Sequence, residues 1–165
     1  KSTIKTTIKS KYFIRTVSNE FDPYTIRELV RNVLDTEELF SEEFIELNAR
    51  QFISEKKEQT YSLILVYRGE KGFQAKGKEP LILLVDGERF APEKVFPERN
   101  FTKQKEFRDR VQEEETFRIN TEILKKIAYA KEVKVKITSD KRSIVAKFSD
   151  ANILGYREFY EKFIK

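Results

Sequence analysis

The fold is decided by residues 120–163, NTEILKKIAYAKEVKVKITSDKRSIVAKFSDANILGYREFYEKF. Asn120 precedes apolar residues that recur on one helical face, so a helix is predicted over 121–130. Residues 131–138 and 143–148 alternate apolar and polar side chains, as strands with one buried face do. The short turn between them makes the two strands an antiparallel hairpin.

A wide apolar stripe follows this hairpin and predicts a last helix over 151–164, with Asp150 as its N-cap. Upstream, residues 61–67 and 81–85 are the two most apolar runs in the chain. Each is short and bounded by turn signals, which indicates a central buried strand. Asp86-Gly87 after the second run predicts a type I′ hairpin, because both of its central residues need positive φ.

The N-terminal half has a weaker pattern. Asp22-Pro23 is a helix-start signal, and the apolar spacing behind it predicts a third helix over 23–35. An extended segment competes there, since Thr, Val, Ile and Asn are weak helix formers. Residues 44–54 favour a strand, and residues 106–119 favour one that is interrupted at Glu113-Glu114-Glu115.

Hairpin connections and one-sided patterning together predict the α+β class. The expected architecture is a single antiparallel sheet of about six to eight strands, with the helices packed mainly on one face. The chain has 165 residues, a length that suits one domain. Residues 11–165 are assigned to that domain, and residues 1–10 to a basic, Ser/Thr-rich arm or tether.

Four residue types are missing: His, Cys, Met and Trp. The lack of His and Cys removes imidazole and thiolate catalysis and the usual ligands of zinc, haem and iron–sulfur clusters. No recognisable catalytic motif replaces them. The sequence therefore predicts a protein that is not an enzyme and that holds no cofactor or metal.

The net charge of +5 is carried by residues 1–19, which contain five basic residues and no acidic one. The rest of the chain is neutral overall, which makes a nucleic-acid partner an unfavoured choice because such partners need a basic face on the fold. No apolar run is long enough to span a bilayer, so membrane contact is expected only through a tether. A start without Met is typical of a processed chain, and removal of a signal peptide leaves such a start.

The outer face of the C-terminal hairpin gathers basic residues and is a candidate anion or partner patch. Its members are Lys134, Lys136, Arg142 and Lys147. Phosphate, anionic lipid or acidic polysaccharide would suit it. The favoured alternative is a solvated sheet face whose lysines deter edge-to-edge pairing.

Phe73 is a candidate partner residue, because it lies in the Gly- and Lys-rich loop 68–79. An apolar side chain in such a loop is either tucked under the fold or anchors a partner. The glycines of this loop fit neither phosphate-binding spacing. The acidic run 113–115 is interpreted as solvated, since neighbouring residues on a strand point to opposite faces.

Five segments carry a family resemblance over about residues 44–163: FIELNARQFI, YSLILVYRGEKGF, EPLILLVDGERF, INTEILKKIAYAKEVKVKI and FSDANILGYREFYEKF. The series resembles a group of uncharacterised bacterial envelope proteins, with spirochaete lipoproteins of unknown function the nearest. The resemblance implies a secreted or lipid-anchored α+β module and brings no site residue. The acylated Cys of a lipoprotein is not in this sequence.

The preferred hypothesis is a non-enzymatic, extracytoplasmic binding or structural domain of a bacterial envelope protein. It would be periplasmic, anchored to the outer membrane or extracellular, with a host or envelope protein, a polysaccharide or an anionic surface as partner. Three alternatives stay open. They are a nucleic-acid-binding domain that uses the basic arm, a carrier of apolar ligands with a cavity between sheet and C-terminal helix, and a hydrolase or transferase built on paired carboxylates.

Overall fold

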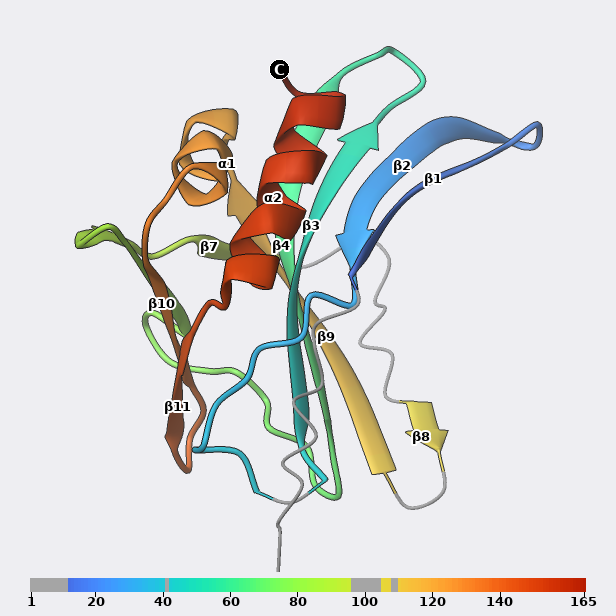
Figure 1. Ribbon diagram of the computed structural model, residues 1–165. Helices are drawn as coiled ribbons and strands as arrows, with labels where there is room; N and C mark the ends of the chain where they lie inside the picture. The colour runs from blue at the N-terminus through green and yellow to red at the C-terminus, as the bar shows by residue number, and fades with distance from the viewer. Residues whose placement is uncertain (1–11, 41, 96–104, 108–109) are drawn as a thin grey trace, which may run out of the picture.

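The structure is a computed structural model that describes residues 12–40, 42–95, 105–107 and 110–165. These residues form two antiparallel sheets and two helices (Figure 1). The α+β class is thereby confirmed. The strands, expected in one sheet, divide between two. The predicted arm, residues 1–10, lies outside the described residues.

The large sheet carries the longest strands of the described chain. Its strands, in spatial order, are β1 (Phe13–Asn19), β2 (Asp22–Val30), β3 (Phe44–Ile53), β4 (Gln59–Gly69), β9 (Arg110–Ile119) and β7 (Glu93–Val95), and β8 (Lys105–Phe107) also pairs with β9. Every neighbouring pair is antiparallel. β3 and β4 lie where the apolar patterns predict them. β9 runs without a break through residues 113–115, so the predicted interruption there is wrong.

The small sheet has the order β11 (Ser143–Lys147), β10 (Val133–Thr138), β5 (Leu81–Val85) and β6 (Glu88–Phe90). Asp86 and Gly87, which join β5 to β6, have φ angles of 49° and 84°, so both adopt the positive φ that the sequence predicts. β5 pairs with β10, with Leu83 opposite Val135. The two most apolar runs of the chain therefore end in different sheets.

Both C-terminal helices are confirmed as α1 (Thr121–Ala128) and α2 (Asp150–Phe163). The N-cap of α2 is Ser149, and the prediction of Asp150 is wrong by one residue. The Ser149 hydroxyl accepts a hydrogen bond from the Asn152 N–H at 3.1 Å, and the Asn152 side chain accepts one from the Ser149 N–H at 2.9 Å. This reciprocal box leaves Asp150 in the first turn, where its charge suits the helix dipole.

The predicted helix over 23–35 is wrong, because residues 22–30 form strand β2. Asp22 closes the two-residue turn of the β1–β2 hairpin, paired with Asn19, instead of capping a helix. Glu28 and Leu29 are adjacent, so they face opposite sides of the sheet, and both are buried. Burial on both faces hides the period of two that would otherwise mark a strand.

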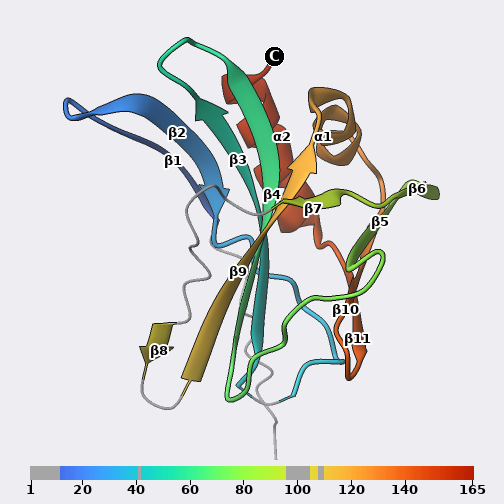
Figure 2. The ribbon, with the colours of Figure 1, turned by 180° about the vertical axis from the view of Figure 1, so that it is seen from behind.

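The core lies between the large sheet, the small sheet and α2. α2 crosses one face of the large sheet (Figure 1), and seen from behind that face is hidden and both helices lie beyond the sheet (Figure 2). Leu63 of β4 and Phe117 of β9 are fully buried on this side, as are Tyr156 and Phe159 of α2. Burial of such large apolar side chains is the main stabilising contribution to the fold.

Two buried amides tie the helix to the end of β2. The Asn152 side chain donates to the Asn32 side-chain oxygen at 2.8 Å and to the Val33 carbonyl at 2.9 Å. The Tyr156 hydroxyl donates to the Leu47 carbonyl at 2.9 Å, and burial raises the pKa of this phenol. These contacts satisfy polar groups that burial would otherwise penalise, and they set the position of α2 on the sheet.

Side chains from the β2–β3 connection cover the outer edge of the small sheet. The Thr36 hydroxyl donates to the Val145 carbonyl at 2.6 Å, and the Val145 N–H donates to the Glu38 carboxylate. Val145 belongs to β11, the outermost strand on that side. An edge strand whose backbone groups are already bonded is a poor template for pairing with another chain.

Candidate functional site

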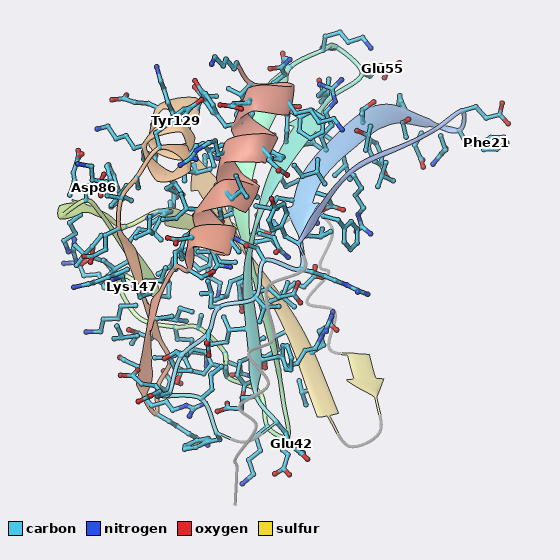
Figure 3. The ribbon with its side chains drawn as sticks, in the orientation of Figure 1. Phe21, Glu42, Glu55, Asp86, Tyr129 and Lys147 are labelled. Atoms are coloured by element: carbon cyan, nitrogen blue, oxygen red, sulfur yellow. The ribbon has the colours of Figure 1, made fainter. Side chains whose placement is uncertain are left out.

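An open cleft of about 560 Å³ lies where β3 begins, β4 ends and the β10–β11 turn approaches them. We call it the aromatic cleft. It is lined by Phe40, Glu43, Tyr67, Glu70, Lys71, Gly72, Phe73, Ser139, Lys141 and Arg142. Its residues come from three separate parts of the chain, 40–43, 67–73 and 139–142. Glu42, labelled in Figure 3, marks this end of the molecule.

The floor of the aromatic cleft is set by the loop that follows β4. Phe73 is 7% exposed, so it is tucked under the fold, and its ring centroid lies 5.4 Å from that of Tyr67. The Phe73 and Gln74 N–H groups donate to one Glu113 carboxylate oxygen at 3.1 and 2.8 Å. A Cβ on Gly72 would collide with the same carboxylate, so any other residue there would have to displace the loop or the Glu113 side chain.

Glu113 is 2% exposed, so its interpretation as a solvated acid is wrong. Alternation along β9 turns this side chain inward, and the backbone amides of the loop satisfy one of its oxygens. The other oxygen has no hydrogen-bond partner among the described residues. A buried carboxylate with such partners is a strong, local anchor for the loop that carries Phe73.

One wall of the aromatic cleft is the side chain of Arg142. Its guanidinium carbon lies 4.0 Å from the centre of the Phe40 ring and 5.7 Å from that of Phe73. The guanidinium also donates to the Glu43 carboxylate. Phe40 itself is 67% exposed. The cleft therefore presents an exposed ring with a paired arginine over it, an arrangement that cation–π attraction favours.

Glu43 is the hub of the polar contacts. Burial alone would raise the pKa of its carboxyl, but hydrogen bonds from Arg142, the Tyr67 hydroxyl and the Phe40 N–H outweigh burial and hold that pKa below its usual range. Burial and donation to Glu43 together raise the pKa of Tyr67. At neutral pH Glu43 is therefore an anion that accepts hydrogen bonds, and Tyr67 keeps its proton.

The four basic candidates do not stay together. Lys134 and Lys147 face each other across β10 and β11, and Lys136 faces Val145 on the same outer face. Arg142 lies in the turn and points into the aromatic cleft beside Phe73. The structure thus joins two candidates that the sequence treats separately, and leaves three lysines on the outer face.

The three lysines share their face with an acid and with apolar residues. Glu132 forms ion pairs with Lys147 at 3.3 Å and Lys134 at 3.5 Å. The hydrogen bond from Lys147 and the charge of Lys134 lower the pKa of the Glu132 carboxyl. Leu84 and Val145 are exposed on the same face. Partial neutralisation weakens the case for a dedicated anion site here.

Among the residues that make the cleft contacts, Phe40 is missed by the sequence, and Glu43 and Tyr67 are not assigned to a site by it. Tyr67 is hidden in the apolar run of β4, and Glu43 sits among other acids. The one usable signal is an exposed Phe inside the acidic segment LFSEE at residues 39–43. Phe40 has the acidic residues Glu38 and Glu42 at strand spacing on either side, so it is not part of an apolar strand face.

The alternatives find little support in the described residues. Two other hollows lie beside α1 and beside the loop at residues 75–80, and neither these nor the aromatic cleft is lined by α2. The carrier hypothesis therefore gains no cavity from them, and the nucleic-acid hypothesis depends on an arm outside the described residues. In the described residues, no cluster of three or more metal-binding side chains occurs, and no helix is long and apolar enough to cross a membrane.

The chain was compared with protein-family models, with curated proteins and with solved structures, and none of the three comparisons finds a match.

Proposed function

We propose that the protein is a non-enzymatic binding domain of a bacterial envelope protein, held outside the cytoplasm, and that the aromatic cleft is its binding site. The observation that carries the proposal is the Phe40–Arg142–Phe73 stack, with Phe40 67% exposed at the mouth of a cleft whose floor is aromatic. Exposed aromatic and Arg side chains are the residue types that dominate binding energies.

The titratable groups of the cleft support binding rather than catalysis. A general acid or base works best with a pKa near the working pH. The pKa of Glu43 is lowered and that of Tyr67 is raised, so both move away from neutrality. Arg142 is committed to Glu43. These groups hold the shape of the cleft and leave the rings as its contact surface.

Binding is tested by NMR with the ¹⁵N-labelled protein and N-acetyl-phenylalaninamide as the probe. We expect the amide signals of Gly72, Phe73 and Arg142 to shift on titration. The test variant is Phe40→Ala, which removes an exposed ring without opening the core. It should weaken the affinity for the probe about tenfold or more. Inorganic phosphate serves as a second probe. If either probe shifts only the signals of the Lys134–Lys147 face and none in the cleft, the proposed site is contradicted.

The compartment is tested separately with the full-length gene product in its own cells. We expect the domain to be cleaved by protease added after the outer membrane is opened, with the inner membrane intact. A product that stays with the cytoplasmic fraction would contradict the extracytoplasmic assignment and leave the binding site unaffected.

A further inference from the structure

The turn of the β1–β2 hairpin presents one large apolar side chain to solvent. Phe21 is 86% exposed, the highest fraction for any large apolar residue in the described chain. Figure 3 shows it at the tip of a hairpin that projects away from the rest of the molecule. An isolated exposed residue needs no explanation, but a ring at the end of a projecting arm is placed as a binding anchor is.

The turn that holds Phe21 is ordered by one side chain. The Asn19 side-chain oxygen accepts hydrogen bonds from the N–H groups of Phe21 at 2.8 Å and Asp22 at 2.9 Å. The Asn19 amide also donates to the Asp22 carboxylate at 2.6 Å. A tip that is already ordered loses little conformational entropy when it binds, so Phe21 can act as an anchor at small cost.

The tip is acidic, because Glu20 and Asp22 flank Phe21 and no basic residue lies between Asn19 and Asp22. An anionic membrane would repel these carboxylates. The chemistry that fits the tip is an aromatic pocket with basic residues on its rim. Such a pocket would take the ring and pair with the flanking acids.

The aromatic cleft of the same chain has this chemistry. Phe40 and Phe73 supply aromatic surface, and Lys71 and Lys141 line the cleft without forming an ion pair with any described residue. Glu70 also lines the cleft and offsets one of the two charges. A volume of about 560 Å³ lies within the range of small binding pockets and is large enough for a phenyl ring.

The two features cannot meet within one molecule. Phe21 and Glu42, which marks the cleft end, lie far apart at different ends of the fold (Figure 3). A contact between tip and cleft therefore joins two copies and uses a different surface of each. Contacts of this heterologous kind generate rings or open chains of subunits.

We propose that the protein associates head to tail, with Phe21 of one copy seated in the aromatic cleft of the next and Glu20 and Asp22 facing its Lys71 and Lys141. The inference rests on the proposed function, because it names the occupant of the same cleft. Charge complementarity between tip and rim is what selects a second copy as that occupant.

Sedimentation velocity over a concentration series at low salt tests the association. We expect the wild type to form dimers and larger species, and both Phe21→Ala and the double variant Lys71→Glu, Lys141→Glu to stay monomeric. Val17→Ala is the matched control, since Val17 is an exposed apolar residue of the same hairpin and should associate like the wild type. A wild type that is monomeric throughout would overturn the proposal.

Mixing the two defective proteins is the sharper test. Phe21→Ala keeps its cleft and the rim variant keeps its tip, so the mixture has one working contact. We expect a one-to-one dimer and nothing larger. A symmetric contact cannot be restored in this way, so a mixture that stays monomeric would overturn the head-to-tail arrangement.

A cyclic peptide of residues 18–23 separates this proposal from the proposed function. If the peptide shifts the cleft signals while the whole protein remains monomeric, the cleft binds an acidic aromatic segment of another protein and self-association is wrong. If neither the peptide nor the phenylalanine probe affects the cleft, the proposed function fails as well. The protein is also mixed with phosphatidylcholine vesicles. If it binds them and Phe21→Ala does not, the tip is a membrane contact and self-association through it is wrong.

Discussion

Glu43 shows how a single carboxylate organises the candidate site. It accepts hydrogen bonds from the Arg142 side chain, the Tyr67 hydroxyl and the Phe40 N–H, so it connects β4, the β10–β11 turn and the segment before β3. Because its side chain is largely buried, these partners replace the water that it loses. Removing the charge leaves Arg142 without its counter-ion and weakens the hydrogen bonds that Arg142 and Tyr67 donate to the shared oxygen.

Glu43→Gln is expected to lower the free energy of unfolding at neutral pH by about 1–3 kcal/mol, the usual cost of losing hydrogen bonds to a charged group. The pKa of Glu43 is lowered in the folded protein. Its contribution is therefore present above the unfolded-state pKa of about 4.3, and is lost as the pH falls through the folded-state pKa. Urea unfolding at several pH values should show the gap between wild type and variant shrinking in acid. A gap that stays constant with pH would refute this role.

Glycine is favoured at position 72 by the lack of space for a side chain, and not by the backbone angles there. Gly72→Ala is expected to push the loop away from Glu113 and cost about 1–3 kcal/mol, because the carboxylate stays buried and loses its two amide donors. The ring of Phe73 should move with the loop, which its aromatic proton shifts would report. Lys78→Ala, an exposed change in the same loop away from Glu113, is the control. Unchanged Phe73 shifts in Gly72→Ala would contradict the expected displacement.

At the scale of elements, local patterns predict those that bury one face. β10 and β11 alternate cleanly, α1 and α2 carry caps and stripes, and Asp86-Gly87 marks its hairpin. β2 escapes prediction because its buried Glu28 is neutralised by Arg15 of β1 and Arg50 of β3, at 2.6 and 3.1 Å. No local window contains that information. The choice of β10 over β4 as the partner of β5 is equally non-local.

The same limit applies to the candidate site. Phe73 and Arg142 can be singled out from composition and loop context, one by one. They meet because the β10–β11 turn approaches the end of β4. That approach cannot be deduced from the pairing within either hairpin. Glu113 looks like part of a solvated acidic run until the alternation of β9 is known. Pairing between distant segments, rather than local preference, creates the cleft.

The covered edge of β11 allows a prediction at this scale. The double variant Thr36→Val, Glu38→Ala removes both side chains that bond the Val145 backbone. We expect faster aggregation, measured by light scattering under native conditions, because an open edge strand pairs with other chains. Glu37→Ala, which changes the exposed residue between them, should aggregate like the wild type. Equal rates for the double variant and this control would show that the edge needs no cover.

At the scale of the whole molecule, one core joins the two sheets and α2, so we expect them to unfold together. Phe159→Ala is expected to cost about 3–5 kcal/mol, as loss of a fully buried Phe does. Far-ultraviolet circular dichroism and tyrosine fluorescence should show coincident transitions in both proteins. Leu154→Ala, on the exposed side of the same helix, is the control and should cost less than about 1 kcal/mol. Separate transitions for the two probes would contradict a single cooperative unit.

The attachment of α2 to the first strands also constrains when the chain can fold. Asn152 reaches Asn32 across 120 positions of sequence, so the apolar face of the large sheet stays bare until the last helix has been made. A nascent chain emerging from the ribosome would thus hold long uncovered strands until α2 arrives. Such a chain completes its fold only after α2 has been made, and a chaperone that holds it until then would raise its yield.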